Sequence, residues 1–252
     1  MFRYFIELSY NGHTFNGWQI QPNAPSVQAE INQALSLLLK QEINIVGAGR
    51  TDTGVHASFF VAHFDSIIPL PSLPNLVDKL NRFLTKEIAI HTIYPVSPQA
   101  HARFSALSRT YKYYIDKKKN PFTHPFTFQT YPIPDIESMN QACQILFEYN
   151  DFTSFSKLHT DTQTNLCTIL EARWEENAQQ LVFTIKANRF LRNMVRAIVG
   201  TLLQVGQHRI TLDTFRSIIE QKNRCKAGTS VPGNALFLTD IEYPNNLKIT
   251  QS

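Results

Sequence analysis

The sequence is poor in the residues that build disulfide frameworks, metal sites and membrane spans. Its three cysteines are widely spaced and form no Cys-x-x-Cys pair, and its eight histidines form no His-x-x-x-His pair. We therefore expect neither disulfides nor a metal site. No apolar run approaches the ~20 residues that a membrane-spanning helix requires, so no membrane contact is expected.

The two common nucleotide-binding loops are also absent. The sequence contains no Gly-x-x-x-x-Gly-Lys-Ser/Thr motif, and no Gly-x-Gly-x-x-Gly motif opens a helix. The first residues, Met1 to Leu8, alternate like a strand and include Glu7, which is not typical of a secretory signal. We therefore expect a cytoplasmic protein.

Positive charge is concentrated in two segments, although the net charge is only +4. From Arg103 to Lys119 there are six basic residues and one acid, and from Lys186 to Arg196 there are four basic residues and no acid. The rest of the chain is therefore acidic. Two basic clusters on an acidic chain favour a polyanionic partner, although two solvated faces would give the same pattern.

A loop rich in glycine, Gly47 to His56, lies between two segments whose β-branched and aromatic residues predict strands. The first ends in Ile45-Val46 and the second runs from Phe59 to Phe64. Glycine lets the backbone approach a ligand or another strand closely. Arg50 and Asp52, two residues apart on this loop, are typical of a placed active-site pair. A hairpin with a local salt bridge is the alternative interpretation.

The order Gly-Ala-Gly-Arg-Thr-Asp-x-Gly-Val-His resembles the signature of the tRNA pseudouridine synthase A family. In that family the aspartate is the catalytic residue, and it corresponds here to Asp52. The matching arginine helps to extrude or replace the target nucleotide, which assigns Arg50 to RNA contact. The resemblance spans nearly the whole chain, from the region of Trp18 to the strand that contains Leu236.

The segment from Phe190 to Gly200 resembles the family's Phe-Leu-x-x-Met-Val-Arg helix, which places its arginine at Arg196. An arginine on so apolar a helix is costly unless it is paired. In the family its partner is the catalytic aspartate, here Asp52. Arg192 lies four residues earlier on the expected helix face and is a candidate phosphate contact. Arg192-Asn193 replaces the family's usual histidine-containing pair, so RNA contacts there are expected to differ.

The segment before Tyr111 resembles the family's approach to its active-site tyrosine, whose ring can stack on a flipped uracil. From the residues alone, ordinary strand packing is the simpler interpretation, because Tyr113 shares the same strand face. Leu236 corresponds to the leucine that closes one wall of the family's uracil pocket, with Ala235 in place of the usual glycine. Plain core packing of Leu236 is the alternative.

The resemblance implies isomerisation of uridines 38, 39 and 40 in the tRNA anticodon stem-loop by a homodimer that needs no cofactor. Asp52 would attack or assist at the ribose C1′, or act through a glycal route, and the sequence does not separate these. One rival is a catalytically silent RNA-binding protein of the same fold. A second is a hydrolase that uses Asp52 with His56.

The order of the expected elements, together with the family resemblance, implies an α+β protein made of two ferredoxin-like α/β halves with largely antiparallel sheets around a central cleft. The first half, residues 1–103, carries the Asp52 loop, and the second, residues 104–252, completes the cleft. Strands are expected at 3–10, 43–46, 59–64, 87–95, 108–115, 168–174, 181–187 and 236–243. Helices are expected from the N-cap Ser26 to about residue 38 and at 73–84, 136–147, 190–205 and 212–221.

Overall fold

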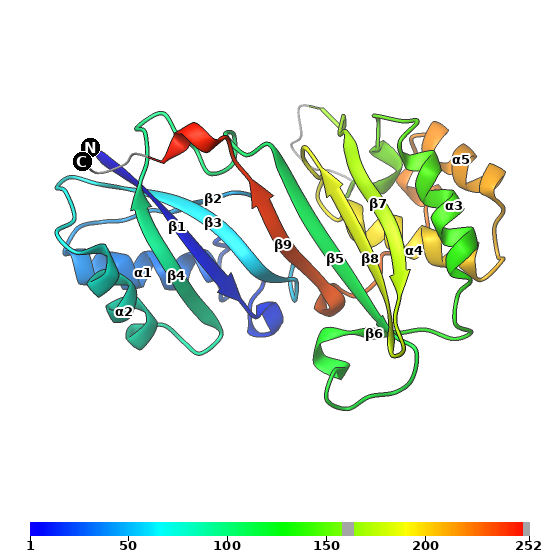
Figure 1. Ribbon diagram of the computed structural model, residues 1–252, viewed down its shortest axis with the longest axis horizontal. Helices are drawn as coiled ribbons and strands as arrows, with labels where there is room; N and C mark the ends of the chain where they lie inside the picture. Colours follow the sequence, from blue (N-terminus) through cyan, green and yellow to red (C-terminus); the bar gives the residue numbers. More distant parts are fainter. Residues whose placement is uncertain (158–163, 249–252) are drawn as a thin grey trace. The chain divides into compact units, whose positions relative to one another are not determined.

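The computed structural model describes residues 1–157 and 164–248, which divide into two compact units. Ser108–Phe237 forms the second unit, and the residues on either side of it form the first. The described residues contain five α-helices and nine strands whose pairings are largely antiparallel, which confirms the predicted α+β class (Figure 1). Within that part of the chain, no helix has the length and hydropathy needed to cross a membrane.

The first unit has the element order of a ferredoxin-like domain. Its elements are β1 (Phe2–Tyr10), α1 (Val27–Leu39), β2 (Val46–Gly47), β3 (His56–Ser66), α2 (Leu73–Phe83) and β4 (Ile88–Pro95). Strand β1 lies between β3 and β4, β2 pairs with β3, and all three pairings are antiparallel. The two helices contact each other (Figure 1). The strand order β4-β1-β3-β2 is the one that this element order favours.

Helix α1 begins where the sequence predicts, because its capping interaction is local. The Ser26 side chain accepts a hydrogen bond from Ala29 N at 3.3 Å. The helix then buries an apolar stripe of Val27, Ile31, Ala34 and Leu35. It ends at Leu39, and the next residue, Lys40, has a left-handed conformation.

The predicted strand at 43–46 is wrong over most of its length, since β2 covers only Val46–Gly47. The backbone N–H groups of Ile43 and Ile45 donate to side chains of α1 instead of to a strand. Their acceptors are Ser36 Oγ and Asn32 Oδ1, each at 2.9 Å. Polar residues four positions apart on one helix face therefore satisfy this backbone and fix the approach to the glycine-rich loop.

The second unit packs helices against a second antiparallel set of strands. Its elements are β5 (Ser108–Asp116), β6 (Phe128–Gln129), α3 (Ile136–Leu146), β7 (Ile169–Glu176), β8 (Gln180–Ala187), α4 (Met194–Gly206) and α5 (Leu212–Glu220). Strand β8 lies between β5 and β7, and the short β6 pairs in parallel with the end of β5. The last strand, β9 (Leu236–Glu242), begins in the second unit and ends in the first.

Helix α4 begins later than predicted, at Met194 rather than at residue 190. Asn193 precedes it with a left-handed φ of 67°, which asparagine tolerates better than most residues. Its Nδ2 donates to Ser230 Oγ at 2.6 Å. Arg192 therefore lies before the helix, and the prediction that it shares a helix face with Arg196 is wrong.

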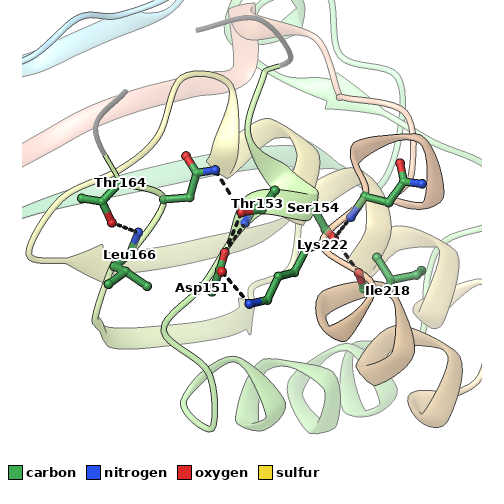
Figure 2. A network of polar contacts seen from close by, with 9 residues as sticks. Asp151, Thr153, Ser154, Thr164, Leu166, Ile218 and Lys222 are labelled. Carbon is green, nitrogen blue, oxygen red and sulfur yellow. Dashed lines mark hydrogen bonds and ion pairs between the residues drawn. The ribbon is translucent and has the colours of Figure 1, made fainter. Parts of the chain in front are cut away.

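A network of polar contacts joins the segment after α3 to the end of α5 (Figure 2). Asp151 accepts hydrogen bonds from Thr153 and lies 2.9 Å from Lys222 Nζ. Ser154 Oγ donates to the Ile218 carbonyl at 2.6 Å. These contacts hold the segment after α3 against the end of α5, and we assign them a structural role.

Candidate active site

The connection from β2 to β3 is held in place by Thr51, the residue between the predicted functional residues Arg50 and Asp52. Thr51 is buried, its Oγ1 lies 2.9 Å from the Tyr10 hydroxyl, and its carbonyl accepts from Trp18 N at 3.3 Å. Arg50, on one side of it, is exposed, and Asp52, on the other, is half-buried. The backbone is therefore fixed while both charged side chains reach the surface of the first unit.

The chain between β1 and α1 lies directly behind this loop. Gly17 has a φ of +94°, and a Cβ atom there would sit 2.4 Å from the Thr51 carbonyl oxygen. A Cβ atom on Gly47 would sit 2.6 Å from the indole of Trp18, which stacks on Phe60 with ring centroids 4.1 Å apart. Glycine permits both approaches. The segment around Trp18 thus positions the Asp52 loop, a role that the sequence did not indicate.

His56, the possible general base of the rival hydrolase, has a structural hydrogen bond. Its Nδ1 accepts from the backbone N–H of Gly12 at 3.0 Å, and the ring is buried. A neutral histidine that accepts at Nδ1 carries its proton on Nε2. Neither nitrogen then offers a lone pair for proton abstraction, which argues against a catalytic pair with Asp52.

In the second unit, Arg196 in the first turn of α4 is held by the chain that packs across the helix. Its Nε donates to the Val231 carbonyl at 2.7 Å, and Val231 N donates back to the Arg196 carbonyl at 3.2 Å. This approach depends on Gly200, where a Cβ atom would sit 1.9 Å from the Thr229 carbonyl oxygen. A small residue one turn after the arginine is therefore part of the positioning of Arg196.

The structure separates the two tyrosines that the strand pattern left equivalent. Tyr113 is fully buried, its hydroxyl donates to the Pro232 carbonyl at 3.2 Å, and burial raises the pKa of this hydroxyl above its usual range. Tyr111 is half-buried and makes an edge-to-face contact with Phe190 at 5.2 Å. Tyr113 is thus a core residue, whereas Tyr111 keeps part of its ring accessible.

One short segment contacts Arg196 and leads to Leu236, two of the predicted residues of the second unit. Val231 holds Arg196, Pro232 accepts from Tyr113 on β5, and the chain then reaches Leu236, which is buried at the start of β9. Of the sequence-predicted site residues, Tyr111, Arg196 and Leu236 belong to this unit. Asp52 and Arg50 belong to the first.

Comparison with known proteins gives matches along almost the whole chain. The tRNA pseudouridine synthase A of Parabacteroides distasonis is 59% identical over 247 residues, which is 98% of each chain. That of Bacteroides thetaiotaomicron is 54% identical over 250 residues, covering 98% of this chain and 93% of its own. The more distant enzyme of Bacillus subtilis is 38% identical over 242 residues, 94% of this chain and 98% of its own.

The chain belongs to the tRNA pseudouridine synthase A family. A family model described as tRNA pseudouridine synthase also matches residues 142–244, from α3 to the end of β9. That match includes Arg196 and Leu236, whereas the Asp52 loop is covered by the whole-chain relatives. Members of this family are isomerases.

The described residues contain no cluster of three or more histidine, cysteine, aspartate or glutamate side chains suited to a metal ion. The positioning residues that sequence reasoning missed are small or buried: Gly12, Gly17, Trp18 and Gly200. No periodicity marks them, because each works by close approach to a segment far away in the chain. The glycine of the Gly-Trp pair was the one signal available in the sequence.

Proposed function

We propose that this protein converts uridines 38, 39 and 40 of the tRNA anticodon stem-loop to pseudouridine, with Asp52 as the catalytic nucleophile. Family membership supports tRNA pseudouridylation as the reaction. The positions and the role of Asp52 rest on the resemblance of the Gly47–His56 loop to the family signature. A homodimer, which the family resemblance implies, and a cytoplasmic location are also part of the proposal, and sedimentation equilibrium tests the assembly.

The observation that carries the proposal is the way Asp52 is held. A catalytic carboxylate must be reachable by substrate and fixed to within about 0.5 Å. Two features support this role: Asp52 is half-buried at the surface, and Thr51 beside it is buried and bonded on two sides. The backbone N–H of Val55 also donates to the Asp52 carbonyl at 3.1 Å, which closes the turn after it.

The reaction breaks the bond between uracil N1 and ribose C1′ and forms a bond from C5 to the same C1′. The hydrogen on C5 leaves to solvent and a proton is gained at N1, so atoms and charge balance. Asp52 supplies the carboxylate, either by attacking C1′ or in a glycal route. The target base must first leave its stack, at a cost of a few kcal/mol.

The other residues take the roles that the resemblance assigns. Arg50 occupies or opens the place of the extruded nucleotide, and its exposure is consistent with RNA contact. The resemblance pairs Arg196 with Asp52 and so gives the arginine the role of a positively charged partner for that carboxylate. Tyr111 stacks on the uracil and Leu236 closes the pocket wall. That residues 104–252 complete the cleft remains a prediction.

Tritium release from unmodified tRNA carrying 5-tritiated uridine tests the proposal directly. Wild-type protein should release tritium, and Asp52→Asn should release none, because the amide cannot act as a nucleophile. Asp78→Asn is the matched control, since Asp78 is an exposed acid on α2. Failure of the wild type to release tritium, or full activity of Asp52→Asn with the control also active, would contradict the proposal.

The same assay separates the rivals. A silent RNA-binding protein would bind tRNA without releasing tritium. A hydrolase would release free uracil and leave an abasic site, and it would depend on His56. The engagement of His56 Nδ1 with Gly12 N favours the isomerase over that hydrolase.

A further inference from the structure

The connection between β5 and β6 projects past the ends of the neighbouring strands of the second unit (Figure 1). It has an unusual composition, because residues 117 to 127 contain three lysines, two phenylalanines and no acid. Lys118 and Lys119 are exposed, and Phe122 is 91% exposed. The tip of this loop therefore presents two cations beside one solvated aromatic ring.

This loop is fixed to the strand from which it leaves. Asp116, at the end of β5, is buried and accepts hydrogen bonds from Thr123 Oγ1, Thr127 Oγ1 and Gln180 Nε2. Burial would raise the carboxyl pKa of Asp116, but these donors lower it below its usual range. One carboxylate thus ties both ends of the loop to the sheet.

The tip itself is ordered by backbone turns. Asn120 Oδ1 accepts from Phe122 N at 3.0 Å, and the Asn120 carbonyl accepts from His124 N at 3.0 Å. Phe126 N donates to the Thr123 carbonyl at 2.8 Å. A loop closed by local hydrogen bonds presents its side chains with little ordering cost on binding.

Two phenylalanines of the loop differ in their environment. Phe126 packs toward the sheet, with its ring 6.2 Å from that of Phe237. Phe122 is left almost fully in water, so its ring gains none of the stabilisation that burial gives an aromatic side chain. An exposed aromatic side chain near lysines in the sequence is the combination by which proteins bind single-stranded nucleic acid, through base stacking and phosphate contact.

We infer that the tip of this loop, Lys118, Lys119 and Phe122, binds an RNA segment outside the reacting nucleotide. Phe122 stacks on an unpaired base, and the two lysines contact the phosphates around it. The inference rests on the proposed function for the identity of the RNA. Within β5, Tyr111 and Asp116 are five residues apart, a separation of about 16 Å along the strand. The loop therefore contributes to affinity and leaves the chemical step unchanged.

The test compares binding of unmodified tRNA over a series of salt concentrations. Phe122→Ala should weaken binding about tenfold, as loss of one base stack does, without changing the salt dependence. Phe122→Tyr should retain wild-type affinity. The double variant Lys118→Ala/Lys119→Ala should reduce the slope of log Kd against log salt by about 1.4, the value for two phosphate contacts on a single strand.

Matched controls use an exposed phenylalanine and an exposed lysine elsewhere. Phe147→Ala, at the end of α3 next to Glu148, and Lys86→Ala, between α2 and β4, should leave Kd and its salt slope unchanged. Thermal denaturation checks that every variant is folded. At saturating enzyme, the loop variants should release tritium at the wild-type single-turnover rate.

Each outcome decides between hypotheses. If the wild type releases no tritium, the proposed function fails. The Kd values of the variants for tRNA still test whether the loop binds RNA. If Phe122→Ala and the lysine variant bind tRNA within twofold of wild type, the inference is overturned. A change of sedimentation coefficient in Phe122→Ala would assign the loop to a contact between two copies of the chain, which also overturns it.

Discussion

Replacing Gly17 by alanine should displace the Asp52 loop without changing any side chain of the proposed chemistry. Gly17 has a φ of +94°, where a residue with a side chain is strained by about 1–2 kcal/mol. The new Cβ would lie 2.4 Å from the Thr51 carbonyl oxygen. Because this oxygen belongs to the backbone, no side-chain rotation can relieve the clash. Overpacking of this kind costs about 1–3 kcal/mol more.

The expected destabilisation is therefore about 3 kcal/mol, which lowers the Tm of a protein of this size by roughly 6–12 °C. Relieving the clash to 3.0 Å moves the Thr51 carbonyl, and with it the peptide that leads to Asp52, by about 0.6 Å. Because a misplacement of about 1 Å costs on the order of 100-fold in rate, we expect about a tenfold loss of kcat. Tritium release well below the variant's Tm measures this loss.

Gly49→Ala is the matched control for stability, since a Cβ atom there meets no protein atom within 4 Å. It should keep the wild-type Tm. If Gly17→Ala also keeps the wild-type Tm, the clash with Thr51 does not constrain this loop. If its Tm falls but kcat at low temperature does not, the position of Asp52 tolerates the shift, and the argument from positioning is refuted.

Three further predictions concern single side chains. Gly200→Ala should unfold the protein at lower temperature by a larger margin than Gly17→Ala, because the Cβ would lie 1.9 Å from the Thr229 carbonyl oxygen; an unchanged Tm would contradict this packing. Asp65→Asn should destabilise by about 1–2 kcal/mol at pH 7, since Asp65 accepts two hydrogen bonds from Arg3 at 2.8 and 2.7 Å. That hydrogen bonding lowers the Asp65 pKa, so the Tm difference from wild type should shrink as the pH falls below about 4. His56→Leu should cost about 1–3 kcal/mol by leaving a buried N–H without its acceptor, yet retain tritium release in the folded fraction, whereas a catalytic histidine would abolish it.

Helices with local capping signals could be predicted from the sequence. Ser26, Asp135 and Thr211 each cap a helix with their own side chains, accepting from residues two or three positions later. Such interactions need no distant partner, and the predicted starts of α1, α3 and α5 are confirmed. The strands expected at 108–115 and 181–187 likewise agree with β5 and β8 to within one residue at each end.

Two elements whose ends depend on polar contacts with distant side chains were placed wrongly. The backbone at 43–45 bonds to side chains of α1, so an apolar run that looks like a strand is not one. The start of α4 is set by Asn193, which is held by Ser230. Both departures come from polar contacts that no periodicity records.

For the site, the sequence by itself determined which side chains carry the resemblance, because a motif such as Gly47–His56 is a local order of residue types. Only the tertiary structure decided how that order is held in place. Gly17 lies against Thr51, and Val231 lies across Arg196 beside Gly200. These contacts join segments that are far apart in the chain. They are possible because Gly17 and Gly200 have no Cβ atom. The sequence alone does not show which glycines matter in this way, because the neighbouring backbone is brought there only by the fold.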